Sequence, residues 1–352
     1  MEQTKAVRRG EELEKDQLLT YLKNHIEGLP SEELVVEQFQ AGHSNLTYLL
    51  KVGEWETVLR RPPLGPVAPR AHDMARESTV MATLAPHLSI IPKPIHFCSD
   101  QDVIGAPFFL MERKKGIVLD TDFPKGLEPT ADLARTISEQ LVDRLVDLHS
   151  INYKETKLVE LTKPEGFLER QVHSWIKRYD QAKTEDHEGL IELTDYLMKN
   201  IPKSTDATVI HYDYKLNNAM FSADGQKMVG LFDWEMATVG DPLCDVGVAL
   251  SYWIEPSDPI LLKRGFGKPP VTVQEGFYTR REFVEQYARK SGRDLSDINY
   301  YLTFAYFKLA VIAQQIYYRY EKGQTKDPRF ARFNETVAAL ITHGRTTSTN
   351  ER

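Results

Sequence analysis

Cysteine is scarce in this chain of 352 residues, which contains only Cys98 and Cys244. Two distant thiols without a Cys-x-x-Cys pair argue against a disulfide framework and fit a reducing compartment such as the cytoplasm. A basic excess is also lacking, because 51 acidic residues outnumber 44 basic ones and the formal net charge is −7. A nucleic-acid-binding protein needs positive charge to offset phosphates, so we expect no nucleic acid as a partner.

Long uncharged hydrophobic runs are missing as well. The most apolar stretch, 300–318, contains Lys308, Gln314 and Gln315, and it predicts a buried amphipathic helix instead of a membrane span. The N-terminal residues 1–16 lack the apolar segment of a secretory signal, so we expect a cytoplasmic protein without membrane contact. With 41% hydrophobic and 27% charged residues, the composition is that of a globular chain long enough for two domains.

The first third of the chain is rich in strand patterns. Leu18, Leu22 and Ile26 recur every four residues, which predicts a helix over about 13–27. Three β-rich runs separated by short turns predict an antiparallel meander, and a helix that Asp73 can cap precedes two further strands. In chain order we expect strands 34–39, 47–52 and 56–60, a helix over about 74–85, and strands near 94–98 and 107–112.

From residue 130 onward, helical periodicity dominates. Ile137, Leu141, Leu145 and Leu148 share one face and predict a helix over about 130–149. The later helices are expected over about 165–182, 187–200, 242–254, 278–290, 296–320 and 328–343. A β-rich part is therefore followed by a helical part.

This order predicts an α+β fold with the bilobal, protein kinase-like architecture. The N-lobe would hold a five-stranded antiparallel sheet with one helix. The C-lobe would be mainly helical, with a short catalytic hairpin formed by the apolar runs 208–210 and 228–232. We expect an N-terminal extension and helix over 1–30, a nucleotide-binding N-lobe over 31–113, and a C-lobe over 114–352 with the catalytic loop, metal site and acceptor pocket.

Ionisable residues follow both of these apolar runs. After the first, His211, Asp213 and Asn218 fit the spacing His-x-Asp-x-x-x-x-Asn, which in kinases places a base and a metal ligand on one loop. We expect Asp213 as the base, Asn218 as a metal ligand, and Lys215 as a charge facing the transferred phosphoryl group. The alternative is that Asp213 and Asn218 only stabilise a turn. The full motif spacing and the second apolar run that ends in acids favour the catalytic interpretation over this alternative.

Asp233 and Glu235 follow the second run. Because oxygen ligands suit Mg²⁺, we expect Asp233 to be the second metal ligand, supplied by the neighbouring strand. Glu235 points to the same side two residues later, and the pattern leaves two alternatives open for it. It could reach a second Mg²⁺ or only cap a turn.

A candidate phosphate loop lies between the first two predicted strands and contains Gly42, Ser44 and Asn45. Its backbone N–H groups, with the hydroxyl and amide side chains, could hold the β- and γ-phosphate oxygens of ATP. A loop with a single glycine is equally typical of a plain hairpin turn, so the motif alone leaves both readings open.

Four motifs together resemble the aminoglycoside phosphotransferase / choline kinase-like family, especially bacterial phosphotransferases and the kinase domains fused to acyl-CoA dehydrogenases. They read Gly42-His-Ser44-Asn45, Leu59-Arg60-Arg61-Pro62, His211-Tyr-Asp213-Tyr-Lys215-Leu-Asn-Asn218 and Asp233-Trp-Glu235-Met-Ala-Thr-Val-Gly240-Asp241-Pro-Leu-Cys-Asp245. The likeness runs from about residue 34 to 335, and the last two motifs are the specific ones. Tyr212 departs from the family's usual Gly and Lys215 from its usual Arg, which keeps the charge but loses the planar fork.

The resemblance also implies how the nucleotide is bound. Arg60, in preference to Arg61, would bind the α- and β-phosphates and pair with Glu77 of the following helix. The alternative is that both arginines are solvated surface charges, and we expect one of the two to be solvated in either case. Backbone groups near Met111-Glu112-Arg113 would contact adenine. For Asp241 and Asp245, helix capping and bracing of the catalytic loop are the expected roles.

We therefore expect an enzyme that uses ATP and Mg²⁺ to phosphorylate a hydroxyl of a small-molecule metabolite. Acids and bases are mixed in the C-terminal half, so no carboxylate-lined pocket for a polycationic aminoglycoside is indicated. The resemblance suggests a hydroxyacyl-CoA or a similar hydroxy compound as the acceptor. The alternatives are a nucleotide-binding pseudokinase or partner module of an acyl-CoA dehydrogenase without turnover, and a helical scaffold without a nucleotide site. The oligomeric state stays open.

Overall fold

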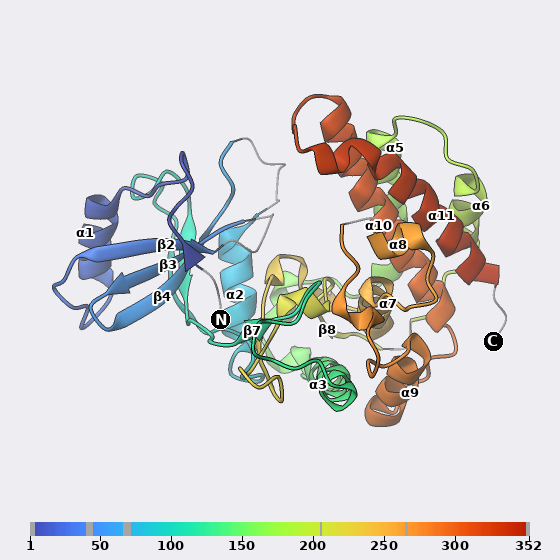
Figure 1. Cartoon of the computed structure of the whole chain (residues 1–352), viewed down its shortest axis with the longest axis horizontal. Coiled ribbons are helices and arrows are strands. Elements are labelled where there is room, and N and C mark those ends of the chain that lie inside the picture. Colours follow the sequence, from blue (N-terminus) through green and yellow to red (C-terminus); the bar gives the residue numbers. More distant parts are fainter. Residues whose placement is uncertain (1–3, 40–44, 66–71, 205, 265–266, 350–352) are drawn as a thin grey trace. The chain divides into compact units, whose positions relative to one another are not determined.

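The structure, a computed structural model, describes residues 4–39, 45–65, 72–204, 206–264 and 267–349. The chain forms two compact units, and neither is continuous in sequence. The first comprises Met1–Val118, Ala219–Asp224 and Met228–Ala237, and the second comprises Leu119–Asn218, Gly225–Lys227 and Thr238–Arg352. Figure 1 follows both along the sequence. The functional lobe boundaries at 30/31 and 113/114 remain a prediction.

The first unit is built on a six-stranded antiparallel sheet with the order β1-β2-β3-β4-β6-β5. All five predicted strands are present in it. The sixth, β1, pairs Thr4 with Phe39 and Lys5 with Gln38 at the sheet edge, and two residues are too few to show alternation in a sequence. The strands are β1 (Thr4–Lys5), β2 (Leu34–Phe39), β3 (Leu46–Val52), β4 (Trp55–Arg61), β5 (Pro94–Cys98) and β6 (Phe108–Met111).

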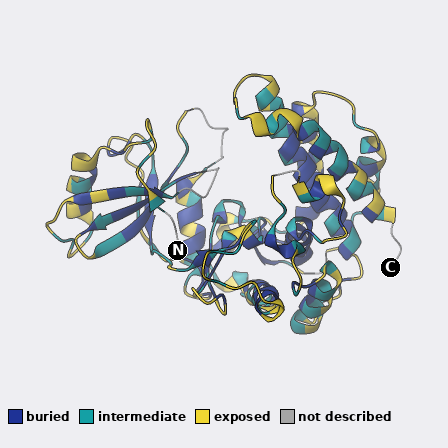
Figure 2. Cartoon of the chain, viewed as in Figure 1, coloured by how far each residue is buried: buried dark blue, intermediate teal, exposed yellow. Residues whose placement is uncertain are grey.

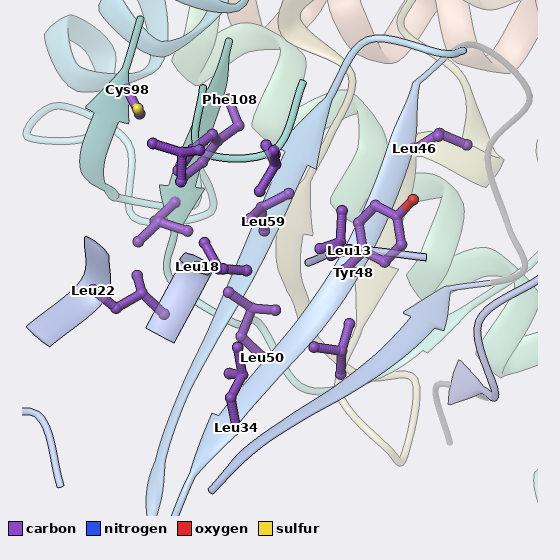
Figure 3. Packing of buried hydrophobic residues seen from close by; sticks show 14 of the residues in the cluster. Leu13, Leu18, Leu22, Leu34, Leu46, Tyr48, Leu50, Leu59, Cys98 and Phe108 are labelled. Carbon is purple, nitrogen blue, oxygen red and sulfur yellow. The ribbon is translucent and has the colours of Figure 1, made fainter. Parts of the chain in front are cut away.

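One face of this sheet is covered by α1 (Lys15–His25), which buries Leu18 and Leu22 completely. Both leucines belong to one apolar cluster with Tyr48 and Leu50 of β3 (Figure 3). Burying a leucine contributes about 1.5–3 kcal/mol, so the predicted helical stripe holds α1 on the sheet. The second helix of the unit, α2 (Met74–Leu84), begins at Asp73, whose side chain accepts a hydrogen bond from the Arg76 N–H as predicted.

Two small sheets carry the segments that precede the candidate catalytic residues. In the first unit, β10 (Met228–Leu231) pairs with β9 (Ala219–Phe221), which also pairs with β7 (Ile117–Val118). In the second unit, β8 (Thr208–Ile210) pairs with β11 (Thr238–Gly240). The expected pairing of 208–210 with 228–232 was therefore wrong. Each run found a three-residue partner that is too short to be recognised from alternation.

The second unit is helical and centres on α10 (Ile298–Glu321). Most residues in the first two thirds of α10 are buried (Figure 2), because it packs against α5, α7 and α11, which confirms the predicted buried helix. The other α-helices of this unit are α3 (Ala131–His149), α4 (Leu158–Leu161), α5 (Phe167–Ala182), α6 (Leu190–Lys199), α7 (Pro242–Tyr252), α8 (Ile260–Arg264), α9 (Arg280–Ser291) and α11 (Phe333–Thr349). Short 3₁₀ helices in the chain are η1 (Tyr153–Glu155), η2 (Leu216–Asn218), η3 (Trp234–Met236), η4 (Val271–Val273) and η5 (Pro328–Arg332).

The predicted α+β class is confirmed by an N-terminal antiparallel sheet and a helical C-terminal part. Among the described helices, none is both long and apolar enough to cross a membrane. Cys98 and Cys244 are both buried and unbonded to each other, as the cysteine count predicted. Burial raises the pKa of the Cys244 thiol far above its usual range, which fits a packed side chain and not a nucleophile.

Candidate functional site

The loop after β8 is held by a carboxylate from α7. Asp245 Oδ2 accepts a hydrogen bond of 2.6 Å from the His211 N–H, and Oδ1 accepts one of 2.6 Å from the Tyr212 N–H. Asp245 is fully buried and also lies 3.2 Å from His149 Nε2. Asp241 caps α7 by accepting from the Leu243 N–H. Bracing by Asp245 and capping by Asp241, both predicted, are confirmed.

The backbone turns sharply at Tyr212, which has a φ of 64° in the left-handed region. Few residues other than glycine adopt this conformation, so surrounding contacts must hold it. The next peptide is fixed on both sides, since the Asp213 N–H lies 3.3 Å from His211 Nδ1 and the Tyr212 carbonyl accepts a 2.6 Å hydrogen bond from Lys308. The backbone that leads into Asp213 is therefore held in one conformation, which fixes where its side chain begins.

The structure brings the three predicted residues of this loop together. Asn218 Nδ2 donates to Asp213 Oδ2 at 3.0 Å and to the Asp213 carbonyl at 2.9 Å. Lys215 Nζ lies 2.8 Å from the same Asp213 carboxylate oxygen, and it also lies over the ring of Tyr252. Asp213 and Lys215 keep 15% and 21% of their side-chain surface exposed, so both remain reachable from solvent.

In the first unit, a second group of acids surrounds Arg60. The guanidinium lies 2.6 Å from Asp233 Oδ1 and 3.1 Å from the Glu77 carboxylate. Burial raises the pKa of the Glu77 carboxyl to about 7, although Arg60 opposes the shift. For Arg60, burial acts to lower the pKa, but the charges of Glu77, Asp233 and Glu235 outweigh it and raise the pKa. The predicted contact between Arg60 and Glu77 is thus present, and Asp233 joins it.

Glu235 lies in η3, and Asn45 and His72 approach its side chain. Asn45 Nδ2 donates to Glu235 Oε2 at 3.0 Å, and His72 Nδ1 lies 2.8 Å from Asn45 Oδ1. Arg76 of α2 donates to the carbonyls of Glu235 and Ala237. The Glu235 carboxylate thus reaches Asn45 of the candidate phosphate loop, and both alternatives for Glu235, a metal contact and a turn cap, stay predictions. The other predicted residues of that loop, Gly42 and Ser44, lie outside the described residues.

The segment predicted to contact adenine is partly engaged within the sheet. The Met111 carbonyl accepts from Thr57 Oγ1 at 2.9 Å, and the Glu112 N–H donates to the Lys93 carbonyl at 2.8 Å. The Glu112 N–H is therefore already paired, whereas the Met111 carbonyl keeps a second lone pair, and the adenine contact stays a prediction.

Arg61 contacts a different part of the fold from Arg60, but both arginine side chains are largely buried. Its side chain is buried, with Nη1 donating to the Ile104 carbonyl at 2.8 Å, and Arg60 is only 12% exposed. Neither arginine is a solvated surface charge, so both the alternative for the pair and the expectation that one of them is solvated were wrong. The reason is that successive residues of β4 point to opposite faces, and each face here is covered.

Sequence reasoning missed four residues that support these groups. They are His72, Arg76, His149 and Lys308. Two of them carried a local signal, since His149 and Lys308 are polar side chains on otherwise apolar helix faces. His72 and Arg76 are polar residues of a kind that is usually exposed. Arg76 contacts Glu235, 159 residues later in the chain, and His72 contacts Asn45 of the candidate phosphate loop, so no local pattern indicated either contact.

The side chains present suit a hard cation such as Mg²⁺. The carboxylates of Asp233 and Glu235 offer oxygen ligands in the first unit. In the second unit, the amide nitrogen of Asn218 donates to Asp213, so its other amide atom, Oδ1, is the acceptor that a cation can use. Each of these oxygen donors is of the type that Mg²⁺ prefers, and their role as metal ligands stays a prediction.

Comparison with known families now gives the class of the protein. The sequence model of the phosphotransferase enzyme family (APH) matches residues 35–269, which is more than half of the chain. The chain therefore belongs to the phosphotransferase enzyme family. Acyl-CoA dehydrogenase family member 11 from Homo sapiens is 33% identical over 334 residues, covering 93% of this chain and 42% of that protein.

Acyl-CoA dehydrogenase family member 10 from Mus musculus is 32% identical over 343 residues, covering 96% of this chain and 32% of that protein. The chain thus spans well under half the length of these relatives. The expected resemblance to kinase domains of such proteins is confirmed.

Solved structures support the same kinase-like phosphotransferase fold. A protein from Ralstonia eutropha JMP134, described as a candidate aminoglycoside phosphotransferase, matches with a TM-score of 0.80 and 26% identity over 96% of this chain and 98% of that one. A thermostable mutant of aminoglycoside phosphotransferase APH(4)-Ia, in a ternary complex with ADP and hygromycin B, matches with a TM-score of 0.58 and 13% identity over 95% and 99%. The second likeness shows the fold alone.

Proposed function

We propose that this chain transfers the γ-phosphoryl group of ATP to a hydroxyl of a small-molecule metabolite, with Mg²⁺ as the metal. The observation that carries the proposal is the arrangement around Asp213, whose carboxylate accepts from both Asn218 and Lys215 while staying open to solvent. A carboxylate that is held rigidly and remains accessible can orient a hydroxyl and accept its proton.

In the proposed reaction, the hydroxyl oxygen of the acceptor forms a bond to the γ-phosphorus. The bond between that phosphorus and the bridging oxygen breaks, and ADP leaves with the electron pair. The hydroxyl proton passes to Asp213, and Lys215 offsets the negative charge of the transferred group. Asp213 acts mainly by orientation, since the transition state for phosphoryl transfer is loose.

Arg60 and the loop 42–45 are the proposed phosphate-binding groups. Arg60 is held by Glu77 and Asp233, which fixes its guanidinium on the sheet. Asn45, together with Gly42 and Ser44, would contact the outer phosphates, and the 111–113 segment would contact adenine. Support comes from the ADP in the APH(4)-Ia complex, which shares the fold of this chain.

Asn218, Asp233 and Glu235 are the proposed metal ligands, and Mg²⁺ bound to them would neutralise charge on the phosphates. In the first unit Asp233 and Glu235 are presented by the η3 turn, directly after β10. Asp233 has a φ of 68°, so strain at this position is maintained by the fold. Strain of this kind accompanies functional turns.

The acceptor we propose is a hydroxyacyl-CoA-like or another hydroxy compound instead of an aminoglycoside. A polycationic acceptor needs a surface of unpaired carboxylates. Arg280 binds Glu255 at 3.0 Å and also binds Asp258, while Arg281 binds Glu285 at 2.8 Å, so these acids are already neutralised. The names of the acyl-CoA dehydrogenase relatives support an acyl-type metabolite.

The test replaces Asp213 by Asn and measures ADP release from Mg²⁺·ATP across a panel of alcohols that includes hydroxyacyl-CoAs with the hydroxyl at different positions. We expect at least one acceptor to stimulate ADP release by the wild type and Asp213→Asn to lower that rate about 10²- to 10⁴-fold. Asp195→Asn, in an exposed ion pair with Lys199 on α6, is the matched control and should keep full activity.

The alternative, a nucleotide-binding module without turnover that partners an acyl-CoA dehydrogenase, is favoured by one observation. The similar proteins are named as dehydrogenases and are more than twice as long as this chain. If ATP raises the melting temperature but no acceptor stimulates ADP release, this alternative replaces the enzyme. If ATP has no effect on melting either, the chain is a scaffold.

A further inference from the structure

Lys308 is a buried lysine in the middle of α10, with only 3% of its surface exposed. Lysine is almost never buried unless its charge has partners. Its ammonium donates a 2.6 Å hydrogen bond to the Tyr212 carbonyl and lies 3.7 Å from the centre of the Tyr212 ring. A second ring, that of Trp175 on α5, lies 5.6 Å away. The charge is thus stabilised by one carbonyl and two aromatic faces.

The carbonyl that Lys308 binds belongs to the peptide that carries Asp213. The N–H of the same peptide lies 3.3 Å from His211 Nδ1, and the two preceding N–H groups both donate to Asp245. Three consecutive peptides before the Asp213 side chain therefore have partners from α7, α10 and the loop itself. Among these partners, Lys308 alone supplies a hydrogen-bond donor to a carbonyl.

The Tyr212 side chain completes the arrangement. Its ring is 3% exposed, packs edge-on against Phe167, and its hydroxyl lies 3.3 Å from Gln171 Oε1. A ring so deeply buried cannot touch an acceptor that arrives from solvent. It instead offers its face to the Lys308 ammonium, while its backbone is held at a φ of 64°.

We propose that Lys308 and Tyr212 form a coupled positioning pair, in which Lys308 holds the left-handed Tyr212 backbone and thereby sets the direction of Asp213. Lys308 does not touch the reacting atoms in this scheme, and it acts through the peptide between Tyr212 and Asp213. Its effect on turnover rests on the proposed phosphotransferase function. Its effect on the loop does not.

The electrostatic surroundings support this assignment. The titratable groups that face Lys308 are Asp213, Asp245, Lys215 and Cys244. Burial lowers the pKa of Lys308 to about 8, and the two carboxylates oppose the shift. The desolvation of this ammonium is offset by the hydrogen bond to the Tyr212 carbonyl and by the rings of Tyr212 and Trp175.

The experiment compares wild type with Lys308→Met, Tyr212→Gly and the double variant. Methionine keeps the apolar stem and removes the donor, and glycine adopts a positive φ without steric cost. For Lys308→Met we expect a fall in kcat of about 10²-fold, with the KM for ATP changed less than about twofold, because the base is misaimed while the nucleotide site is intact. In the Tyr212→Gly background the same substitution should cost less than about tenfold. Lys308→Arg, which keeps the charge and donor, should restore most of the loss.

Hydrogen exchange of the segment 208–218 gives a readout that needs no activity. We expect faster exchange there in Lys308→Met, with exchange of the first-unit sheet unchanged, and Lys308→Gln provides a second variant if methionine prevents folding. Equal losses in the wild-type and Tyr212→Gly backgrounds, or unchanged exchange, would overturn the pairing. If the wild type itself turns over no acceptor, the proposed function fails, and the exchange data still decide the positioning role.

Discussion

The two units fix their acidic groups in different ways. In the first unit, Arg60 is shared by Glu77 and Asp233, and Glu235 is met by Asn45, so the acids are held through side chains. In the second unit, Asp245 and Lys308 bind backbone groups around Asp213 and leave its carboxylate to neighbours on its own loop. One set can exchange partners without moving the backbone, whereas the other has its backbone fixed in advance.

This difference matches the chemistry proposed for each set. A group that binds a charged cofactor must accept a new partner, and a side-chain ion pair can rearrange without movement of the backbone, although breaking the buried pair of Arg60 and Glu77 is costly. A base must instead be aimed before the reaction begins, because misplacement by about 1 Å can cost 10²-fold in rate. The comparison therefore predicts that substitutions around Asp213 in the second unit lower stability and misplace its carboxylate. Substitutions around Arg60 in the first unit should instead lower the affinity for ATP.

The largest effect is expected from Asp245→Ala. The substitution leaves two buried N–H groups and His149 without their carboxylate, so the free energy of unfolding should fall by about 3–5 kcal/mol. Urea unfolding at constant pH measures it. Asp195→Ala on the exposed face of α6 is the control and should change stability by less than about 0.5 kcal/mol. A loss below about 1 kcal/mol for Asp245→Ala would remove the distinction between the units.

An intermediate effect is expected from Arg60→Met. Loss of a charged hydrogen-bonding group worth about 1.5–3 kcal/mol should lower ATP affinity about 10- to 100-fold in calorimetric titration. The neighbouring Arg61→Met is the matched control, because Arg61 binds the Ile104 carbonyl inside the fold. It should lower stability while changing ATP affinity less than about twofold. Equal losses of affinity in both variants would contradict the assignment of Arg60.

The smallest effect, when expressed per pH unit, concerns Lys308. The Lys308 ammonium, whose pKa burial lowers from 10.5 to about 8, binds a proton in the unfolded chain but not in the folded one between these pH values. The free energy of unfolding should therefore rise with pH in this window, by at most about 1.4 kcal/mol per pH unit from this group. Lys308→Met should flatten the rise, and Lys199→Met, at an exposed site, should not. An identical slope in Lys308→Met would show that the burial does not perturb the lysine.

Local patterns predicted most of the fold. The spacing of Leu18 and Leu22 predicted α1, and Asp73 predicted the start of α2. The apolar residues of α3 and α10 likewise predicted that these two segments are helices with buried faces. Strand pairing in the small sheets was not visible. The partner of β8 lies beyond β9 and β10 in the chain, and a run of three residues carries no periodicity that could identify it.

The candidate site was predictable where its residues are close in sequence. Asp213, Lys215 and Asn218 are found in contact because the loop spacing itself demands it. Contacts across the chain followed only where a known architecture supplied them, as for Arg60 and Glu77. Lys308 lies on α10, which begins eighty-six residues after Tyr212. The contact between Lys308 and Tyr212 depends on how α10 packs, and no local sequence pattern predicts that packing.

The interleaving of the two units has a consequence for dissecting the protein. After Val118 the chain returns to the first unit at Ala219–Asp224 and again at Met228–Ala237, which supply β9, β10 and the turn with Asp233. A fragment ending at Val118 would keep β7 but lack both other strands of that sheet, together with Asp233 and Glu235. No single cut can therefore separate the units into intact halves, and a reporter split at the 118/119 boundary would divide the small sheet formed by β7, β9 and β10.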